Sequence, residues 1–349
     1  MAAKKRRKII FRVVLVLLLA FAGAVAYFTL AKSNIYLDGK KYKFIFIPTK
    51  ATYNEMIGML EEENILENKK TFEWLAAVYD LQDNFKPGKY RVIAGMSNRQ
   101  LINLIKSGKQ EPVKITFNSA DRTNEDLVAK ISEKFEISGA ELENFFETET
   151  EISKKYNLNK ETLRCLFIPE SYEILWNTSL PDFMKEIEKT YTSFWTPERK
   201  QKAKACKLSQ AEVITLASVV QSECSNIESE QKKIAGVYIN RLAQNMPLQA
   251  DPTVIFAIGD FTKKRVWEKD LDYDSPYNTY RNKGLPPGPI SLVYTKVIDA
   301  VLNYGHHNYL YFCAKPSLNG YSDYSASYTQ HLKYRDAYRR EMDKRGINK

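Results

Sequence analysis

Residues 211–256 read AEVITLASVVQSECSNIESEQKKIAGVYINRLAQNMPLQADPTVIF, and this stretch is the most informative part of the chain. Its first part, residues 211–224, is expected to form a helix. In that helix three apolar residues share a face with Glu223, at seven, four and three positions before it: Leu216, Val219 and Val220. A carboxylate on an apolar face loses hydration, which disfavours its charged form and raises its pKa. Glu223 is therefore a candidate general acid near neutral pH.

A purely structural role for Glu223 has to be weighed against this interpretation. The carboxylate could be buried and held by a backbone donor, or the apolar face could end before it and leave it in water. Acidic side chains are rarely buried without a partner. Helix geometry alone therefore leaves both alternatives open, and the neighbouring sequence has to decide.

The basic residues of the chain are concentrated at its N-terminus. The chain has 349 residues and a formal net charge of +10. Six of these charges come from the first twelve residues, which contain no acid: Lys4, Lys5, Arg6, Arg7, Lys8 and Arg12. The rest of the chain gives no electrostatic reason to expect a nucleic acid, and no nucleic-acid-binding motif is present.

An apolar segment, VVLVLLLAFAGAVAYFTL at residues 13–30, follows the basic tail. At about 1.5 Å per residue, a helix of this length crosses a hydrocarbon core of roughly 30 Å. We expect a cytoplasmic tail at 1–12 and a single-pass transmembrane helix at 13–31 in the inner (plasma) membrane. Because basic residues stay on the cytoplasmic side, the rest is expected to be periplasmic or otherwise extracytoplasmic. A cleavable signal peptide is the alternative, since alternating alanines occur near the end of the segment.

The cysteines and histidines indicate neither a metal site nor a dense disulfide framework. The four cysteines contain no C-x-x-C pair: Cys165, Cys206, Cys224 and Cys313. Two of the histidines are adjacent and cannot share one face of a helix or strand. A thiolate at Cys224 would need a positioned base or cation, and the histidines are remote in sequence. We expect no cysteine nucleophile, no metal and no cofactor, and the pairing of the cysteines is left open.

The first exported part, residues 33–112, is expected to be a small module of strands and short helices. Residues 33–50 alternate in polarity around a turn signal at Asp38-Gly39, which predicts a β-hairpin. Helical patterns follow, and the last of them stops at Gly108, where a C-cap glycine belongs.

The second exported part, residues 113–349, is expected to be a mixed α+β domain. It divides into a first subdomain at 113–196 and a second at 197–349, which carries Glu223. A helix near 228–245 and a final strand at 308–314 are predicted in the second subdomain. The fold class expected for the whole chain is α+β.

Several sequence words, in this order and spacing, resemble the signature of the MltG/YceG-like endolytic murein (peptidoglycan) lytic transglycosylases. They are FIPESYEI at 167–174, LASVVQSE at 216–223, VYINRL at 237–242, MPLQADPTVIF at 246–256, YNTYRNKGLPPGPIS at 277–291 and YLYF at 309–312. KPGKYRVIAGMS at 86–97 looks like the family's LysM-like module. The resemblance covers roughly residues 43–335. It implies a transmembrane helix, then a small LysM-like α/β module, then a YceG-like catalytic domain.

The resemblance also implies an activity. Such an enzyme cleaves the β-1,4 bond between MurNAc and GlcNAc within glycan strands and leaves 1,6-anhydro-MurNAc ends, beside peptidoglycan synthases of the elongation or division machinery. The resemblance places the catalytic acid at Glu223, which helix periodicity also selects. The sugar's own 6-hydroxyl attacks in this chemistry, so one acid that later acts as a base suffices.

Polar residues in the matching words are expected to line a cleft around Glu223 and to bind sugar hydroxyls and N-acetyl groups. They are Glu170, Tyr172, Gln249, Asp251, Thr253, Asn278, Thr279 and Tyr280. Each has a structural alternative. Asp251 could be a helix cap, the two tyrosines could be core aromatics, and Asn240-Arg241 could be a capping and salt-bridge pair.

Two positions depart from the family pattern. Gln221 stands where many relatives carry Glu. The pattern G-x-H-x-F-S-x-T reads GYSDYSAS at 320–327, without the histidine. Two other functions stay open: a catalytically inert peptidoglycan-binding or divisome scaffold, and a hydrolase in which Glu223 and Asp251 act together on water.

Overall fold

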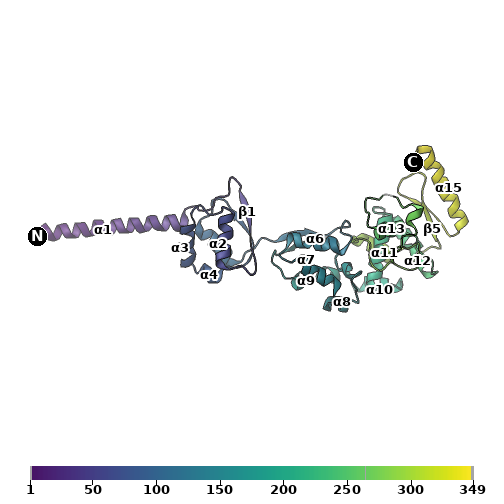
Figure 1. Cartoon of the computed structure of the whole chain (residues 1–349), viewed down its shortest axis with the longest axis horizontal. Helices are drawn as coiled ribbons and strands as arrows, with labels where there is room; N and C mark the ends of the chain where they lie inside the picture. The colour runs from purple at the N-terminus through teal and green to yellow at the C-terminus, as the bar shows by residue number, and fades with distance from the viewer. Residues whose placement is uncertain (1, 264, 347–349) are drawn as a thin grey trace. The chain divides into compact units, whose positions relative to one another are not determined.

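The computed structural model of the chain describes residues 2–263 and 265–346 (Figure 1). The chain forms two compact units. The first unit contains the chain up to Lys114 together with residues 134–136 and 173–179. The second contains 115–133, 137–172 and the chain from Leu180 onward. The fold is mixed α+β, as the sequence predicts.

The first unit begins with a long apolar helix, α1 (Ala2–Ala26), which continues as a π-helical turn, η1 (Tyr27–Ala31). Among the described residues, one helical segment is long and apolar enough to cross a membrane, Arg6–Ala26. Its large side chains are exposed within the unit, from Ile9 to Val25. This exposure is consistent with a membrane anchor, because lipid can solvate the apolar surface that water cannot.

The remainder of the first unit is a small α+β module. It contains β1 (Tyr42–Ile47), α2 (Tyr53–Glu62), α3 (Lys69–Val78), α4 (Leu81–Asn84), β2 (Gly88–Ile93) and α5 (Asn98–Ser107). Thr52, Asn68 and Ser97 cap three of the helices through side-chain oxygens. The last helix ends at Gly108 with a left-handed φ of 67°, as predicted. One buried cluster holds the module together, including Ile47, Met56, Phe72, Tyr90 and Ile102.

The predicted hairpin at residues 33–50 is wrong. The turn at Asp38-Gly39 exists, and both residues have left-handed φ angles. However, β1 pairs antiparallel with β2, with Tyr42 opposite Ile93. The segment before the turn instead forms isolated bridges to Leu66 and Ser97. The local turn signal was correct, but the strand partner lies far away in sequence, where pairing cannot be read from a turn.

The second unit begins with helices around an aromatic core. β3 (Val113–Thr116) and β4 (Ser171–Ile174) form a two-stranded sheet. The helices are α6 (Asn124–Lys134), α7 (Gly139–Glu147), α8 (Glu151–Tyr156), the 3-10 turn η2 (Leu163–Leu166) and α9 (Leu180–Phe194). Phe167 contacts Phe117 and Phe146 in this core, with ring centroids 5.2 and 6.2 Å away.

The rest of the second unit carries the central helix, α11 (Gln210–Glu223). The other elements of this part are α10 (Pro197–Ala205), α12 (Glu228–Ala243), α13 (Asp251–Ile258), η3 (Glu268–Asp270), α14 (Thr295–Leu302), β5 (Tyr311–Ala314), β6 (Ser322–Ser325) and α15 (Tyr328–Arg345). The helix predicted at 211–224 and that at 228–245 are therefore present, with ends shifted by one or two residues. The strand predicted at 308–314 is shorter and begins at Tyr311.

The expectation of a single apolar face on α11 needs correction. Every residue from Val213 to Gln221 is buried, so neighbouring elements cover the helix on all sides. α10, α12, α13 and α14 all contact it. Glu223 is the last residue of this buried helix rather than a polar residue on a one-sided stripe. Its environment is therefore decided by the segments that meet at the helix end.

Candidate active site

The carboxyl group of Glu223 is held at the end of α11 by a neighbouring helix. The hydroxyl of Tyr238, on α12, donates a hydrogen bond of 2.9 Å to Glu223 Oε1. Tyr238 is itself buried, and its ring packs edge-on against Phe312 of β5. The acid is thus fixed in one orientation by a rigid phenol, which the sequence did not identify.

The electrostatic surroundings bring Glu223 into the range of a proton donor. Burial is the largest cause, and it raises the pKa of Glu223 to about 7. The negative charge of Asp251 also raises this pKa, whereas the hydrogen bond from Tyr238 and the charge of Arg241 lower it. Near neutral pH the side chain therefore exists in both protonation states, as a group that first donates and later accepts a proton requires.

Glu223 opens onto a cavity of about 500 Å³ that combines polar and aromatic side chains. The lining includes Glu223, Cys224, Arg241, Gln249, Asp251, Tyr280, Phe312, Ser322, Tyr328 and His331. These residues come from α11, α12, α13, β5, β6, α15 and the loops between them. The apolar environment predicted for Glu223 is therefore incomplete, because the cavity in front of its carboxyl group is largely polar.

Three of the residues expected in the cleft meet in this cavity: Gln249, Asp251 and Tyr280. Asp251 is the first residue of α13, and the cap position is Ala250, without a side-chain hydrogen bond. The carboxylate of Asp251 instead accepts a hydrogen bond of 2.5 Å from the Tyr280 hydroxyl. Gln249 holds a left-handed φ of 54° next to them. The side chains of Asp251 and Tyr280 therefore form a polar pair facing the acid's cavity.

The other expected cleft residues lie outside this cavity. Thr253, Asn278 and Thr279 are buried, and the hydroxyls of the two threonines lie 2.8 Å apart. They join α13 to the loop that carries Tyr280, so their visible contacts are structural. Tyr172 is buried on β4 and donates to the carbonyl of Ile168 at 2.9 Å, while Glu170, just before the strand, is exposed.

Arg241 and Asn240 anchor the chain segment that leads into β5. Arg241 donates to the backbone carbonyls of Leu248 and Leu310, at 2.8 and 2.7 Å. Asn240 donates to the carbonyls of His307 and Tyr309, at 2.7 and 2.9 Å. The pair is structural, as one alternative proposed, but its partners are carbonyls, and no salt bridge to Arg241 occurs among residues 2–263 and 265–346.

Gln221, noted above as a departure from the resembled pattern, also has a structural role. Gln221 donates to the carbonyl of Leu292 at 2.9 Å and accepts from the backbone N–H of Tyr294 at 3.0 Å. An amide can do both, whereas a carboxylate could not donate to the carbonyl. Gln221 therefore holds α11 against the segment before α14. As an amide, it cannot act as a second acid.

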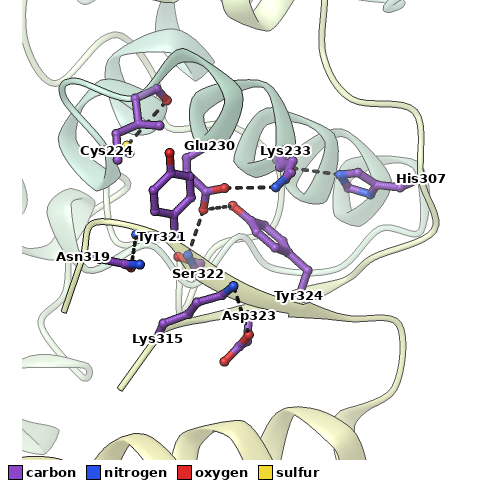
Figure 2. A network of polar contacts seen from close by, with 11 residues as sticks. Cys224, Glu230, Lys233, His307, Lys315, Asn319, Tyr321, Ser322, Asp323 and Tyr324 are labelled. Atoms are coloured by element: carbon purple, nitrogen blue, oxygen red, sulfur yellow. Dashed lines mark hydrogen bonds and ion pairs between the residues drawn. The ribbon is translucent and has the colours of Figure 1, made fainter. Parts of the chain in front are cut away.

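A buried acid on α12 binds β6, which contributes one residue to the cavity lining, and Figure 2 shows the contacts of this acid. Glu230 is 1% exposed, and its Oε2 accepts from the Ser322 backbone N–H at 2.8 Å and from the Tyr324 hydroxyl at 2.9 Å. Lys233 lies 3.1 Å from the other oxygen. Ser322, at the position noted above as departing from the resembled pattern, lines the cavity. Glu230 thus docks β6 on α12.

Sequence reasoning missed Tyr238, Phe312, Tyr328 and His331, which all belong to the site. His331 comes from α15, and its ring stacks on Tyr311 with the centroids 5.3 Å apart. Its pKa is lowered, first by burial and then by Arg241 and Arg335, which keeps the imidazole neutral at neutral pH. The presence of VYINRL and YLYF among the matching words was the available signal for Tyr238 and Phe312. No pattern in the sequence linked His331 to Glu223.

Comparisons with known proteins show which family the chain resembles in sequence and in fold. The sequence model of the YceG-like family matches residues 45–337. A Bacillus subtilis (strain 168) protein named endolytic murein transglycosylase is 31% identical over 337 residues, which cover 92% of this chain and 91% of that protein. A protein of the same name from Streptococcus pneumoniae (serotype 2, strain D39) is 27% identical over 331 residues, covering 85% of this chain and 59% of the relative. The crystal structure of a yceG-like protein from Listeria monocytogenes superposes with a TM-score of 0.54 at 26% identity, covering 84% of this chain and 99% of that one.

Proposed function

The chain belongs to the YceG-like family, and from this premise we propose that it is an endolytic murein transglycosylase with Glu223 as its single catalytic acid and base. The observation that carries the proposal is the placement of Glu223, held by the Tyr238 hydroxyl at a polar cavity of about 500 Å³, where burial raises the pKa of the acid to about 7. Gln249, Asp251 and Tyr280 are proposed to bind the glycan beside it.

The reaction follows from one group that changes its protonation state. Protonated Glu223 gives its proton to the glycosidic oxygen as the bond from that oxygen to C1 of MurNAc breaks. The 6-hydroxyl of the same sugar then forms a bond to C1, and the Glu223 carboxylate takes the hydroxyl proton. The acid is regenerated, no water is consumed, and the products are a 1,6-anhydro-MurNAc end and a free 4-hydroxyl.

The first part of the chain is proposed to place this chemistry at the cell wall. In this proposal α1 is retained as the membrane anchor, the basic tail stays in the cytoplasm, and the catalytic domain lies outside the inner membrane. Positive charge before an apolar span supports this orientation. The module after the anchor is proposed to be LysM-like and to bind glycan, and the partner is proposed to be a peptidoglycan synthase whose nascent strands are trimmed.

Product analysis separates this function from its rivals. Purified sacculi digested with the detergent-solubilised chain are expected to yield fragments with 1,6-anhydro-MurNAc ends, measured by mass spectrometry. Because Asp251 shares the cavity with Glu223, a hydrolase acting through both carboxylates is the specific alternative. Reducing ends with one added water would identify the hydrolase, and intact sacculi would leave only a binding or scaffold function.

The pH dependence of cleavage should respond in opposite directions to two substitutions. Tyr238→Phe removes the hydrogen bond that lowers the pKa of Glu223, so the pKa is expected to rise above about 7. Asp251→Asn removes a charge that raises the same pKa, so it should fall. Because the first step needs protonated Glu223, the rate declines as pH rises through this pKa. The declining limb of the pH–rate profile is therefore expected at higher pH in Tyr238→Phe and at lower pH in Asp251→Asn. Shifts of the same sign would rule out this account of the pKa.

A further inference from the structure

A second cavity, of about 350 Å³, is lined by residues next in sequence to two residues of the site. Ser222 lines this second cavity and Glu223 lines the first. Likewise, Pro252 lines the second and Asp251 the first. The end of α11 and the start of α13 therefore each contribute to both cavities. A polymer substrate extends well beyond the bond that reacts, so a cavity this close to Glu223 can receive another part of the same strand.

The charge of the second cavity is distinct from that of the first. Its described lining contains three cations and no acid: Arg122, Lys263 and Lys296. Lys263 is paired with Asp270 at 2.7 Å, so its charge is compensated. The side chains of Arg122 and Lys296 form no salt bridge within the described part of the chain, while the backbone N–H of Arg122 donates to Asp126 at 2.8 Å. The cavity therefore presents two cationic side chains without an ion-pair partner beside serine and asparagine side chains, Ser119, Ser225 and Asn226.

The guanidinium of Arg122 is held in a form suited to a carboxylate. It lies over the ring of Phe261 at 4.3 Å from the centroid, and the residue is half-buried. Stacking occupies the face of the guanidinium and leaves the N–H groups at its edge available. A planar edge of this kind binds a carboxylate through two parallel hydrogen bonds.

We propose that the second cavity binds the peptide stem carried by the glycan strand, with Arg122 and Lys296 contacting a carboxylate of that stem. This inference rests on the proposed function, because only a peptidoglycan strand brings an acidic peptide alongside the sugar at Glu223. The sugars themselves are neutral in their hydroxyl and N-acetyl groups, so the cations select for the peptide-bearing part of the substrate. The enzyme then distinguishes strands with acidic stems from strands whose stems carry no charge.

Two substrates and two variants test the inference with the full chain in detergent. Strands with unmodified stem peptides are compared with the same strands after chemical amidation of the stem carboxylates. For Arg122→Gln and for Lys296→Glu, KM on the unmodified strands is expected to rise about tenfold, as for the loss of a charged hydrogen bond, with kcat changed by less than about twofold. On amidated strands, variants and parent should have equal KM values. On unmodified strands, added salt should raise the KM of the parent and so reduce the difference in KM between the parent and the variants.

A matched control is available on α10. Lys200 is exposed and forms no ion pair among residues 2–263 and 265–346. Lys200→Glu therefore makes the same change of charge as Lys296→Glu, at a residue that does not line the cavity. It should leave KM unchanged on both substrates. An equal rise in KM on unmodified and amidated strands, or no rise on either, overturns the peptide-binding inference. A parent that cleaves neither substrate would instead overturn the proposed function itself.

Discussion

Glu223→Gln is expected to lower the rate of strand cleavage about a thousandfold, the usual scale for removing a general acid. The amide keeps the size of the side chain and can still accept the hydrogen bond from Tyr238. It cannot deliver a proton to the glycosidic oxygen. Gln221 offers no substitute acid, and the Asp251 carboxylate is bound to Tyr280. The release of soluble fragments from sacculi, followed over hours, measures the remaining rate.

The thermal stability of Glu223→Gln shows whether its loss of activity comes from the missing acid or from a damaged fold. Burial raises the pKa of Glu223, which means that the charged form is disfavoured in the folded chain. A neutral amide should therefore leave the unfolding midpoint unchanged or slightly higher. Glu228→Gln is the matched control, since Glu228 is an exposed acid on α12 paired with Lys232. Full activity in Glu223→Gln, or equal losses in both variants, would contradict the assignment.

The central helix and its acid were predictable because their signals are local. A run of apolar residues with Ser209 before it and Glu212 in the first turn is enough to place a helix, and the structure has a capping box there. The position of Glu223 relative to that apolar run follows from the helical repeat. What was wrong was the environment, since α11 is covered on all sides and the acid's cavity is lined by polar groups from other elements.

The remaining features depend on contacts between residues far apart in sequence. Tyr238 reaches Glu223 only because α12 packs back along α11, and His331 enters the cavity only because α15 packs against β5. The prediction of the strand that pairs with β1 fails for the same reason, because a turn signal reveals a bend but not the strand that lies opposite. Buried side chains such as Thr279 were predicted to bind the substrate because they lie in the matching sequence words. Such a match does not distinguish a residue that contacts the ligand from one that holds a loop in place.

Glu230→Ala is expected to destabilise the second unit by about 3 kcal/mol, because removing one partner of a buried network leaves the others unsatisfied. The substitution deprives the Ser322 N–H and the Tyr324 hydroxyl of their common acceptor (Figure 2). Calorimetry of the full chain should show a fall of roughly 10 °C in the unfolding midpoint of this unit. Activity should fall as well at temperatures below that midpoint, since Glu230 holds β6, and Ser322 of β6 lines the cavity of the acid.

Lys233→Ala separates the buried acceptor from its ion pair. Lys233 approaches Glu230 at 3.1 Å, and its side chain is 45% exposed, so water screens its charge. Its removal leaves the buried Glu230 carboxylate without this cation but keeps both hydrogen bonds from β6, so the cost should be smaller than that of Glu230→Ala and β6 should stay in place. The difference between the two variants then measures how much the hydrogen bonds to β6 contribute, independent of the salt bridge. Equal destabilisation by both would mean that the charge pair, rather than the docking of β6, holds this wall of the cavity.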